Sequence, residues 1–287
     1  MLKNKLLLLL LKCFGCLPLS VGRLLGNAIG RLMYILQLKP VLISRANLRL
    51  FYPQMSTQEI EALCKKRVVH FAQVFIETSR VWRKSSHWLE NKIVAVEGLA
   101  LFQAAMEDKR GTILVLPHQG NWEVIGLWVS PHNKMTSLYK PPSISELDNW
   151  MKASREQSGA TLVPTDGRGV TALLKALQRG ETTAILPDHL PSESGAIIAP
   201  FMGVPTPTMT LLTRLINRSG CQALFCSAIR EPGGWRLHFL PATDELYNQD
   251  ITTAATALNK GVEQIVALAP EQYQWEYKRF RKQPDGS

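Results

Sequence analysis

Several signatures of common enzyme classes are absent from this chain of 287 residues. It has no G-x-S-x-G turn for a serine nucleophile and no G-x-x-x-x-G-K-[ST] phosphate-binding loop. It also lacks a G-x-G-x-x-G sequence after a strand and an H-E-x-x-H zinc motif. These absences count against a serine esterase with its own nucleophile, a P-loop nucleotidase, a dinucleotide-dependent dehydrogenase and a zinc peptidase.

Cysteine is scarce and unpatterned. The five cysteines are Cys13, Cys16, Cys64, Cys221 and Cys226. An odd number without regular spacing fits a reducing compartment better than a disulfide framework. Because Cys13-x-x-Cys16 has no second pair of cysteines to complete a metal site, we interpret both as apolar packing residues and expect no metal there.

Acidic residues are outnumbered, with 23 Asp and Glu against 33 Lys and Arg, which gives a formal net charge of +10. This excess favours an anionic partner, which could be nucleic acid, an acidic protein or anionic lipid. Nucleic acid is the least favoured of the three, because the basic residues form no recognisable module and alternate with aromatic residues only in the short tail.

The N-terminal segment, residues 1–38, lacks the roughly 18 uncharged residues of a clean membrane-spanning helix. Its six leucines, Leu6 to Leu11, are flanked by basic residues, and Pro18 must divide or kink a helix there. On a helical wheel Lys5, Lys12, Arg23 and Arg31 share one arc, which favours a helix in the membrane interface with its basic side toward phosphates. A tilted spanning anchor and a helix packed on the protein's own core are the alternatives.

The rest of the chain, residues 39–287, predicts one α/β domain. Ser56 and Glu59 form a capping-box start for a long helix that runs through Trp82. Strand patterns then cover residues 93–96, 113–116, 135–139, 161–163, 183–186, 223–229 and 235–240, and helical patterns cover residues 99–106, 143–158 and 170–178. Alternating strands and helices that end in a hairpin predict a mixed central sheet flanked by helices.

The strongest chemical signal is the stretch Thr112 to Glu123. A buried strand delivers His118 into a turn through Gly120, and Asn121 then caps a helix whose first turn holds Glu123. If this turn brings the two side chains together, Glu123 orients the imidazole and His118 acts as a general base for a hydroxyl. In the alternative, His118 merely ends a strand and Glu123 lies exposed on the helix.

Three further stretches are candidates for binding. Arg155 ends a helix and could meet phosphate or oxyanion charge, or it could simply cap that helix. Asp188 follows another buried strand, where open α/β sheets place ligand contacts, or it serves only a turn. The apolar stretch of residues 199–208, which includes Phe201, Met202 and Gly203, could wall a hydrocarbon pocket or simply pack.

The run His118-Gln119-Gly120-Asn121-Trp122-Glu123 resembles the H-x-x-x-x-[D/E] signature of glycerolipid-type acyltransferases, in the glutamate form of the lipid A late acyltransferases. The segments Ile185 to Asp188 and Pro200 to Gly203 are also similar to that family, as are Arg45 to Leu48 and the tail from Gln272 to Arg281. The chain departs from the family at His189, where glutamine is expected, and in its short length.

This resemblance implies a glycerolipid-acyltransferase-like fold and a reaction that moves a fatty acyl group from an acyl carrier protein thioester to a hydroxyl of a lipid A precursor. His118 would be the base and Glu123 its partner. Backbone N–H groups at Gly120 and Asn121, with Arg155, would meet the oxyanion. Acyl carrier protein, the lipid A precursor and the membrane surface are the implied partners, at the cytoplasmic face of a bacterial inner membrane, without metal or redox cofactor.

Other functions stay open at this point. The acceptor could be a lysophospholipid, a phosphatidylinositol mannoside or an amino-acid lipid, and the donor could be a coenzyme A thioester. The chain could also be a basic membrane-binding module whose His118 and Glu123 are inert.

Overall fold

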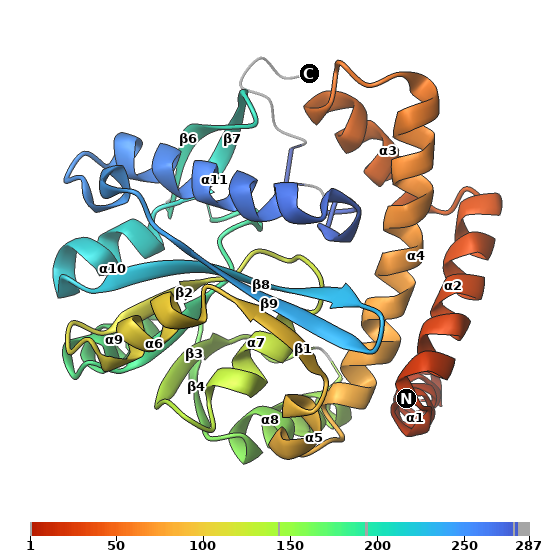
Figure 1. The fold of residues 1–287 in the computed structure, drawn as a ribbon, viewed down its shortest axis with the longest axis horizontal. Helices are drawn as coiled ribbons and strands as arrows, with labels where there is room; N and C mark the ends of the chain where they lie inside the picture. Colours follow the sequence, from red (N-terminus) through yellow and green to blue (C-terminus); the bar gives the residue numbers. More distant parts are fainter. Residues whose placement is uncertain (1, 143, 193–194, 278, 281–287) are drawn as a thin grey trace.

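In the computed structural model, which describes residues 2–142, 144–192, 195–277 and 279–280, a seven-stranded mixed sheet is flanked by helices (Figure 1). Its strands are β1 (Ile93–Glu97), β2 (Thr112–Val115), β3 (Met135–Tyr139), β4 (Ala160–Pro164), β5 (Thr182–Ile185), β8 (Gln222–Glu231) and β9 (Gly234–Pro241). A separate hairpin is formed by β6 (Ala196–Phe201) and β7 (Val204–Met209). The α/β class and all seven strands expected from the sequence are confirmed.

The helices separate into an N-terminal group and a group around the sheet (Figure 1). The first group is α1 (Leu2–Cys16), α2 (Leu19–Ile35), α3 (Lys39–Phe51) and α4 (Thr57–Val81). The second is α5 (Ser86–Glu90), α6 (Leu99–Glu107), α7 (Trp122–Val129), α8 (Ser145–Gln157), α9 (Gly167–Gln178), α10 (Leu211–Ser219) and α11 (Ile251–Leu268). The predicted capping box of Ser56 and Glu59 does start α4. Ser143, where the sequence predicted the start of α8, lies outside the described residues.

The strand order is β1-β9-β8-β2-β5-β3-β4. Strand β2 lies between β5 and β8 and is parallel to both, whereas β8 and β9 are antiparallel. Ile113 and Val115 face one hydrophobic core, and Leu114 and Leu116 face the other. This alternation confirms that β2 is buried on both faces, and it places its carboxyl end beside that of β5.

Helices α1 and α2 are divided at Pro18, as expected, and pack against α4 (Figure 1). Gly22, Gly26 and Gly30 form the buried face of α2. A Cβ atom at Gly30 would lie 2.4 Å from the Cα atom of Val69, so only glycine permits this approach. The boundary at residue 38 therefore lies within one packed set of helices.

The outward side of these helices is apolar. Leu9 is 58% exposed, Leu24 is 69% exposed and Ile35 is 72% exposed. The expectation that Arg23 lies on the basic arc that faces membrane phosphates is wrong, because Arg23 turns inward toward α4. Within the described residues, no helix combines the length and apolarity needed to cross a membrane.

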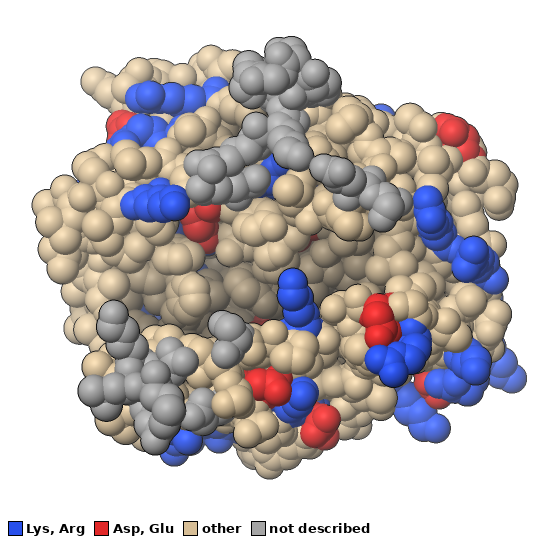
Figure 2. Space-filling view, turned by 180° about the vertical axis from the view of Figure 1, so that it is seen from behind, with Lys and Arg blue, Asp and Glu red and all other residues tan. Residues whose placement is uncertain are grey.

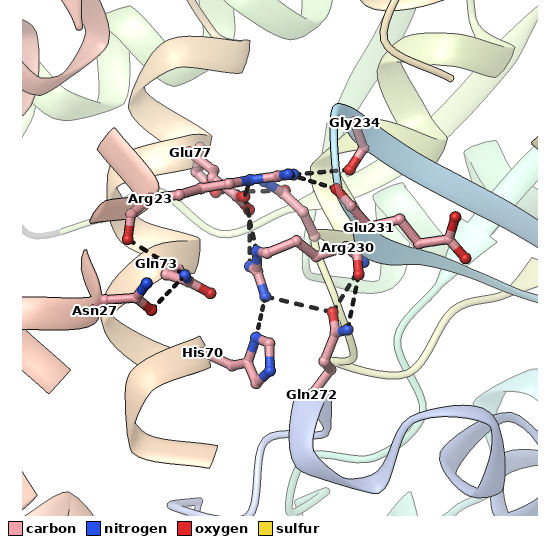
Figure 3. A network of polar contacts seen from close by, with 11 residues as sticks. Arg23, Asn27, His70, Gln73, Glu77, Arg230, Glu231, Gly234 and Gln272 are labelled. Atoms are coloured by element: carbon pink, nitrogen blue, oxygen red, sulfur yellow. Dashed lines mark hydrogen bonds and ion pairs between the residues drawn. The ribbon is translucent and has the colours of Figure 1, made fainter. Parts of the chain in front are cut away.

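Figure 3 shows how Arg23 joins α2 to the sheet. The carboxylate of Glu77 on α4 is fully buried and accepts from Arg23 Nε at 2.5 Å and from Arg230 Nε at 2.7 Å. Arg23 also donates to the carbonyls of Glu231 and Gly234 in the β8–β9 hairpin. The buried ion pairs therefore connect α2, α4 and the hairpin.

A histidine beside this cluster stays neutral. Arg230 Nη1 lies 2.6 Å from Nδ1 of His70. Burial and then the charges of Arg230 and Arg67 lower the pKa of His70 to about 2. The ring nitrogen can therefore accept a hydrogen bond from the guanidinium, and no third positive charge is added near Glu77.

Candidate active site

His118 and Asp188 meet at the edge of the sheet where β2 and β5 end. Nδ1 of His118 lies 2.8 Å from Oδ1 of Asp188, and the backbone N–H of His118 donates to Oδ2 of Asp188 at 2.8 Å. Each residue follows the last residue of its strand by three positions, and these strands are parallel neighbours. Parallel neighbours end at the same edge, so side chains at matching distances beyond them come together.

The charge state of this pair is defined by its surroundings. Burial alone would raise the pKa of Asp188, but the charge and hydrogen bonds of His118 outweigh it and lower the pKa to about 2. An ionised carboxylate only accepts, so Nδ1 of His118 carries the hydrogen. Nε2 makes no hydrogen bond to the described residues and is left to act as a proton acceptor.

Glu123 is not the hydrogen-bond partner of His118. It is buried in the first turn of α7, where its carboxylate accepts from Arg155 at 2.5 and 3.1 Å and from Trp82 Nε1 at 3.0 Å. The turn through Gly120 thus directs Glu123 toward α8 and α4. Burial would raise the pKa of Glu123, but Arg155 outweighs it and keeps the pKa below its ordinary value. The predicted His118–Glu123 pair is therefore replaced by two pairs, His118–Asp188 and Arg155–Glu123.

The predicted oxyanion donors of the turn are occupied. The N–H of Gly120 donates to the carbonyl of Gln272 at 3.1 Å, and the N–H of Asn121 donates to the carbonyl of Ala228 at 3.0 Å. Gly120 has φ of +59°, and a Cβ atom there would lie 2.0 Å from the carbonyl oxygen of Ala228. The two N–H groups therefore hold the turn in place, and Arg155, the third predicted donor, holds Glu123.

A segment near the C-terminus positions the same turn from the other side. The N–H of Gln274 donates to the carbonyl of His118 at 2.9 Å. His189 stacks on the ring of His118 with 3.7 Å between the ring centroids, and Tyr277 stacks on His189 at 3.9 Å. His189 Nε2 also lies 3.1 Å from Oε1 of Gln274. His118 is thus held by its carboxylate, its backbone and a stack of rings.

This support has no local signal in the sequence. From the sequence alone, the tail shows a family resemblance, and His189, which departs from that family, is expected to be structural. No local pattern indicates that residues 272–277 return to a turn about 150 positions earlier in the chain. Lys278 and Arg281 of the tail lie outside the described residues.

The family model for bacterial lipid A biosynthesis acyltransferases matches residues 3–282. The chain belongs to that family. A lipid A biosynthesis palmitoleoyltransferase of Escherichia coli is 29% identical over 94% of the chain and 88% of its own length. A lauroyltransferase of lipid A biosynthesis from the same organism is 28% identical with the same coverage. A phosphatidylinositol mannoside acyltransferase of Mycobacterium tuberculosis is 24% identical over 70% of the chain and 63% of its own length.

The predicted acyl-pocket residues of this acyltransferase build a hairpin instead of a pocket wall. Phe201 is completely buried among the rings of Phe51, Tyr273 and Phe280. Met202 and Gly203 form the turn from β6 to β7, both with positive φ. The alternation of proline with β-branched residues in this stretch is that of a short hairpin, which the sequence interpretation did not recognise.

An apolar cavity of about 80 Å³ lies instead beside Glu123, between α7, α8 and the sheet. Leu116, Leu127, Met135, Leu162 and Leu186 supply much of its apolar lining, with Trp122, Gly126 and the Arg155–Glu123 pair. The ring of Trp122 lies 4.9 Å from that of His118. Trp122 therefore borders both this cavity and the ring of His118.

The Arg155–Glu123 pair leads to a testable difference from the sequence interpretation. Arg155→Ala leaves a buried carboxylate without its cation, which costs on the order of 3–5 kcal/mol of folding free energy. We expect a melting temperature lower by on the order of 10 °C, together with lower activity. The exposed Arg168, whose partner Asp166 is also exposed, supplies a control. Arg168→Ala should change neither the melting temperature nor the activity. Activity lost at an unchanged melting temperature would instead restore Arg155 as an oxyanion donor.

Proposed function

We propose that this acyltransferase moves a fatty acyl group from an acyl carrier protein thioester to a hydroxyl of a lipid A precursor, with His118 as general base. Family membership supports acyl transfer in lipid A biosynthesis. The observation that carries the mechanism is the His118–Asp188 pair at the carboxyl ends of β2 and β5. Asp188 takes the orienting role that the sequence interpretation gave to Glu123.

In this mechanism Nε2 of His118 accepts the proton of the acceptor hydroxyl as its oxygen attacks the thioester carbonyl. A new C–O bond forms, and the carbonyl oxygen gains negative charge in a tetrahedral intermediate. The C–S bond then breaks, and the departing thiolate takes the proton from the imidazolium. Asp188 holds Nδ1–H throughout and stabilises the transient positive charge on the ring. The proposed reaction needs no metal or redox cofactor.

The N-terminal helices support a location at the membrane surface. Large apolar side chains are exposed along α1, α2 and α3, among them Leu6, Leu10, Val21, Leu32 and Leu42. Contiguous exposed apolar surface on a basic protein is typical of interfacial binding. We infer that these helices lie on the cytoplasmic face of a bacterial inner membrane.

A surface view from behind shows a hollow of mostly uncharged residues across the middle of the molecule, with charged residues at its rim (Figure 2).

The excess of basic residues supports an acidic donor protein, because the net charge of +10 would attract an acyl carrier protein. A coenzyme A thioester is the competing donor. We expect faster transfer from the carrier protein, and this preference should weaken as salt screens the attraction. Equal rates with both donors at low and high salt would contradict the assignment of the carrier protein.

We assign the cavity beside Glu123 to the end of the acyl chain. Gly126 lies on α7 at the wall of this cavity, and a Cβ atom there would meet only the end of the Met135 side chain at 3.5 Å. Gly126→Leu should therefore fill the cavity without a backbone clash and shift donor preference toward shorter acyl chains. Gly126→Ala should keep the preference and stabilise α7 slightly. Initial rates with a series of acyl lengths measure the shift, and an unchanged length profile for Gly126→Leu would place the acyl chain elsewhere.

The acceptor is tested by offering one labelled donor to several lipids. We expect transfer to a lipid A precursor and little transfer to a lysophospholipid, a phosphatidylinositol mannoside or an amino-acid lipid. The phosphatidylinositol mannoside is the second candidate, because a mycobacterial relative is a phosphatidylinositol mannoside acyltransferase. Transfer to that lipid alone would reassign the acceptor, and absence of transfer to every lipid would favour a membrane-binding module.

A further inference from the structure

A second cavity, of about 480 Å³, lies where α1 and α2 meet α5 and the β8–β9 turn. We call it the junction pocket. Pro18 and Leu19 line it from the link between the two helices, and Trp88 lines it from α5. Arg80 and Lys92 reach it from α4 and from the residue before β1. It contributes nothing to the mechanism above.

The junction pocket is positively charged. Its lining contains Arg80, Lys92 and Arg23 but no acidic residue. Arg23 shares the buried carboxylate of Glu77 with Arg230, whereas Arg80 and Lys92 have no ion-pair partner among the described residues. Two cations without a counter-ion therefore face a cavity that also has apolar walls.

Arg80 is held in place by neutral groups. Its Nη1 donates to the carbonyls of Gly15 and Cys16 at 3.1 and 3.0 Å, and its guanidinium lies 5.6 Å from the ring of Trp88. Its Nε is buried without a partner within the described part of the chain. These contacts fix the direction of the guanidinium and leave its charge available to an anion.

The junction pocket is separated from Glu123 by α4. Trp82, which bonds to Glu123, follows Arg80 by two residues and therefore lies about 200° further round the helix. The pocket borders the exposed apolar surface at Val21 and Leu24, which flank its lining on α2. A ligand in this place would have its charged part between Arg80 and Lys92 and its apolar part along the membrane-facing helices.

We propose that the junction pocket binds the phosphate headgroup of an anionic membrane phospholipid. This proposal rests on the membrane association proposed above. Arginine and lysine bind phosphate by charge and hydrogen bonds, and the neighbouring leucines suit acyl chains. A bound lipid would fix the position of α1 and α2 on the membrane while the acceptor occupies the site at His118. The acceptor's own phosphates are the alternative source of the same chemistry.

The experiment compares binding of the intact protein to vesicles of phosphatidylcholine with and without about one third phosphatidylglycerol. Lys92→Gln removes one cation of the pocket, and Lys12→Gln removes an exposed cation of α1 that does not line it. Each should lower affinity for the anionic vesicles by about fivefold at low salt, the usual contribution of one basic residue near such a surface. At about 1 M salt the Debye length falls to about 3 Å, so only the effect of Lys92→Gln should persist.

Arg80→Lys should keep most of the vesicle affinity, whereas the double variant Arg80→Gln with Lys92→Gln should lose on the order of twentyfold. Melting temperatures identify variants in which α1 has come loose. Equal salt sensitivity of Lys92→Gln and Lys12→Gln would overturn the proposal in favour of diffuse surface charge.

Acyl transfer in neutral detergent separates this proposal from the proposed function. Lys92→Gln should keep the wild-type KM for the lipid A precursor there, because no anionic phospholipid is present. A raised KM with unchanged vesicle binding would assign the pocket to the acceptor's phosphates and overturn the proposal. A wild-type protein that binds anionic vesicles through Lys92 but transfers no acyl group would contradict the proposed function alone.

Discussion

Asp188→Asn is expected to lower kcat by on the order of 10³–10⁴ while the protein stays folded. The hydrogen bonds of Asp188 explain the size of the effect. Oδ2 accepts the backbone N–H of His118, so the oxygen of an asparagine must remain there. The new NH₂ group then points at Nδ1 of His118, which must accept. The ring proton moves to Nε2, and the nitrogen that should take the hydroxyl proton can no longer do so.

His118→Ala should lower kcat by at least about 10². The double variant His118→Ala with Asp188→Asn should be little worse than the worse single variant, because a base and its orienting group act as a unit. Glu123→Gln supplies the contrast, since its partners are Arg155 and Trp82, so its main effect should be on melting temperature. Initial rates and melting temperatures of these four variants show which carboxylate orients His118. Near-normal turnover in Asp188→Asn, together with a folded but inactive Glu123→Gln, would restore the histidine–glutamate pair.

Glu77→Gln is expected to cause the largest loss of stability, on the order of 3–5 kcal/mol or more, because two buried guanidinium groups lose their shared carboxylate. His70 cannot supply the missing negative charge, because an imidazole ring is either neutral or cationic. Denaturant unfolding measures the loss. The exposed Arg31 on the same helix as Arg23 supplies the control, and Arg31→Gln should leave the free energy of unfolding within about 0.5 kcal/mol of the wild type.

The same network bears on truncation. Removing residues 1–38 takes away Arg23 and exposes the face of α4 on which Gly26 and Gly30 pack. The sequence alone predicts a folded domain that has merely lost its membrane element. Because the truncation also removes the ion pair between Arg23 and Glu77, we expect the truncated protein to be less stable as well. A truncated chain that melts at the wild-type temperature, and a Glu77→Gln variant of unchanged stability, would contradict this role of the network.

The sequence predicted the sheet well because its strands carry local signals. Residues 112–116 form an apolar β-branched and leucine run, and both of its faces are buried. Pro18 divides the N-terminal helices where a missing N–H requires it. The hairpin at residues 231–234 follows from its proline and glycines. In each case the physical cause lies within a few residues of the observed feature.

The active site was predicted only in part, because its geometry depends on which strands are neighbours. Asp188 was selected as a ligand contact, yet only the pairing of β2 with β5 shows that it reaches His118. Glu123 shares the motif of His118, but its direction is determined by Arg155 on a different helix. Arg23 looked like a surface cation because Glu77 and Arg230 are distant in the chain. Local sequence patterns therefore do not predict which distant residues pair with a charged group.

The central claim is that His118 drives acyl transfer to a lipid A precursor. Its most direct test is the mass spectrum of that precursor after incubation with acyl carrier protein thioesters and either wild-type protein or folded His118→Ala. We predict a mass gain of one fatty acid minus water with the wild type and almost none with His118→Ala in the same time. An equal gain with both proteins, or no gain with the wild type and any donor length, would contradict the account.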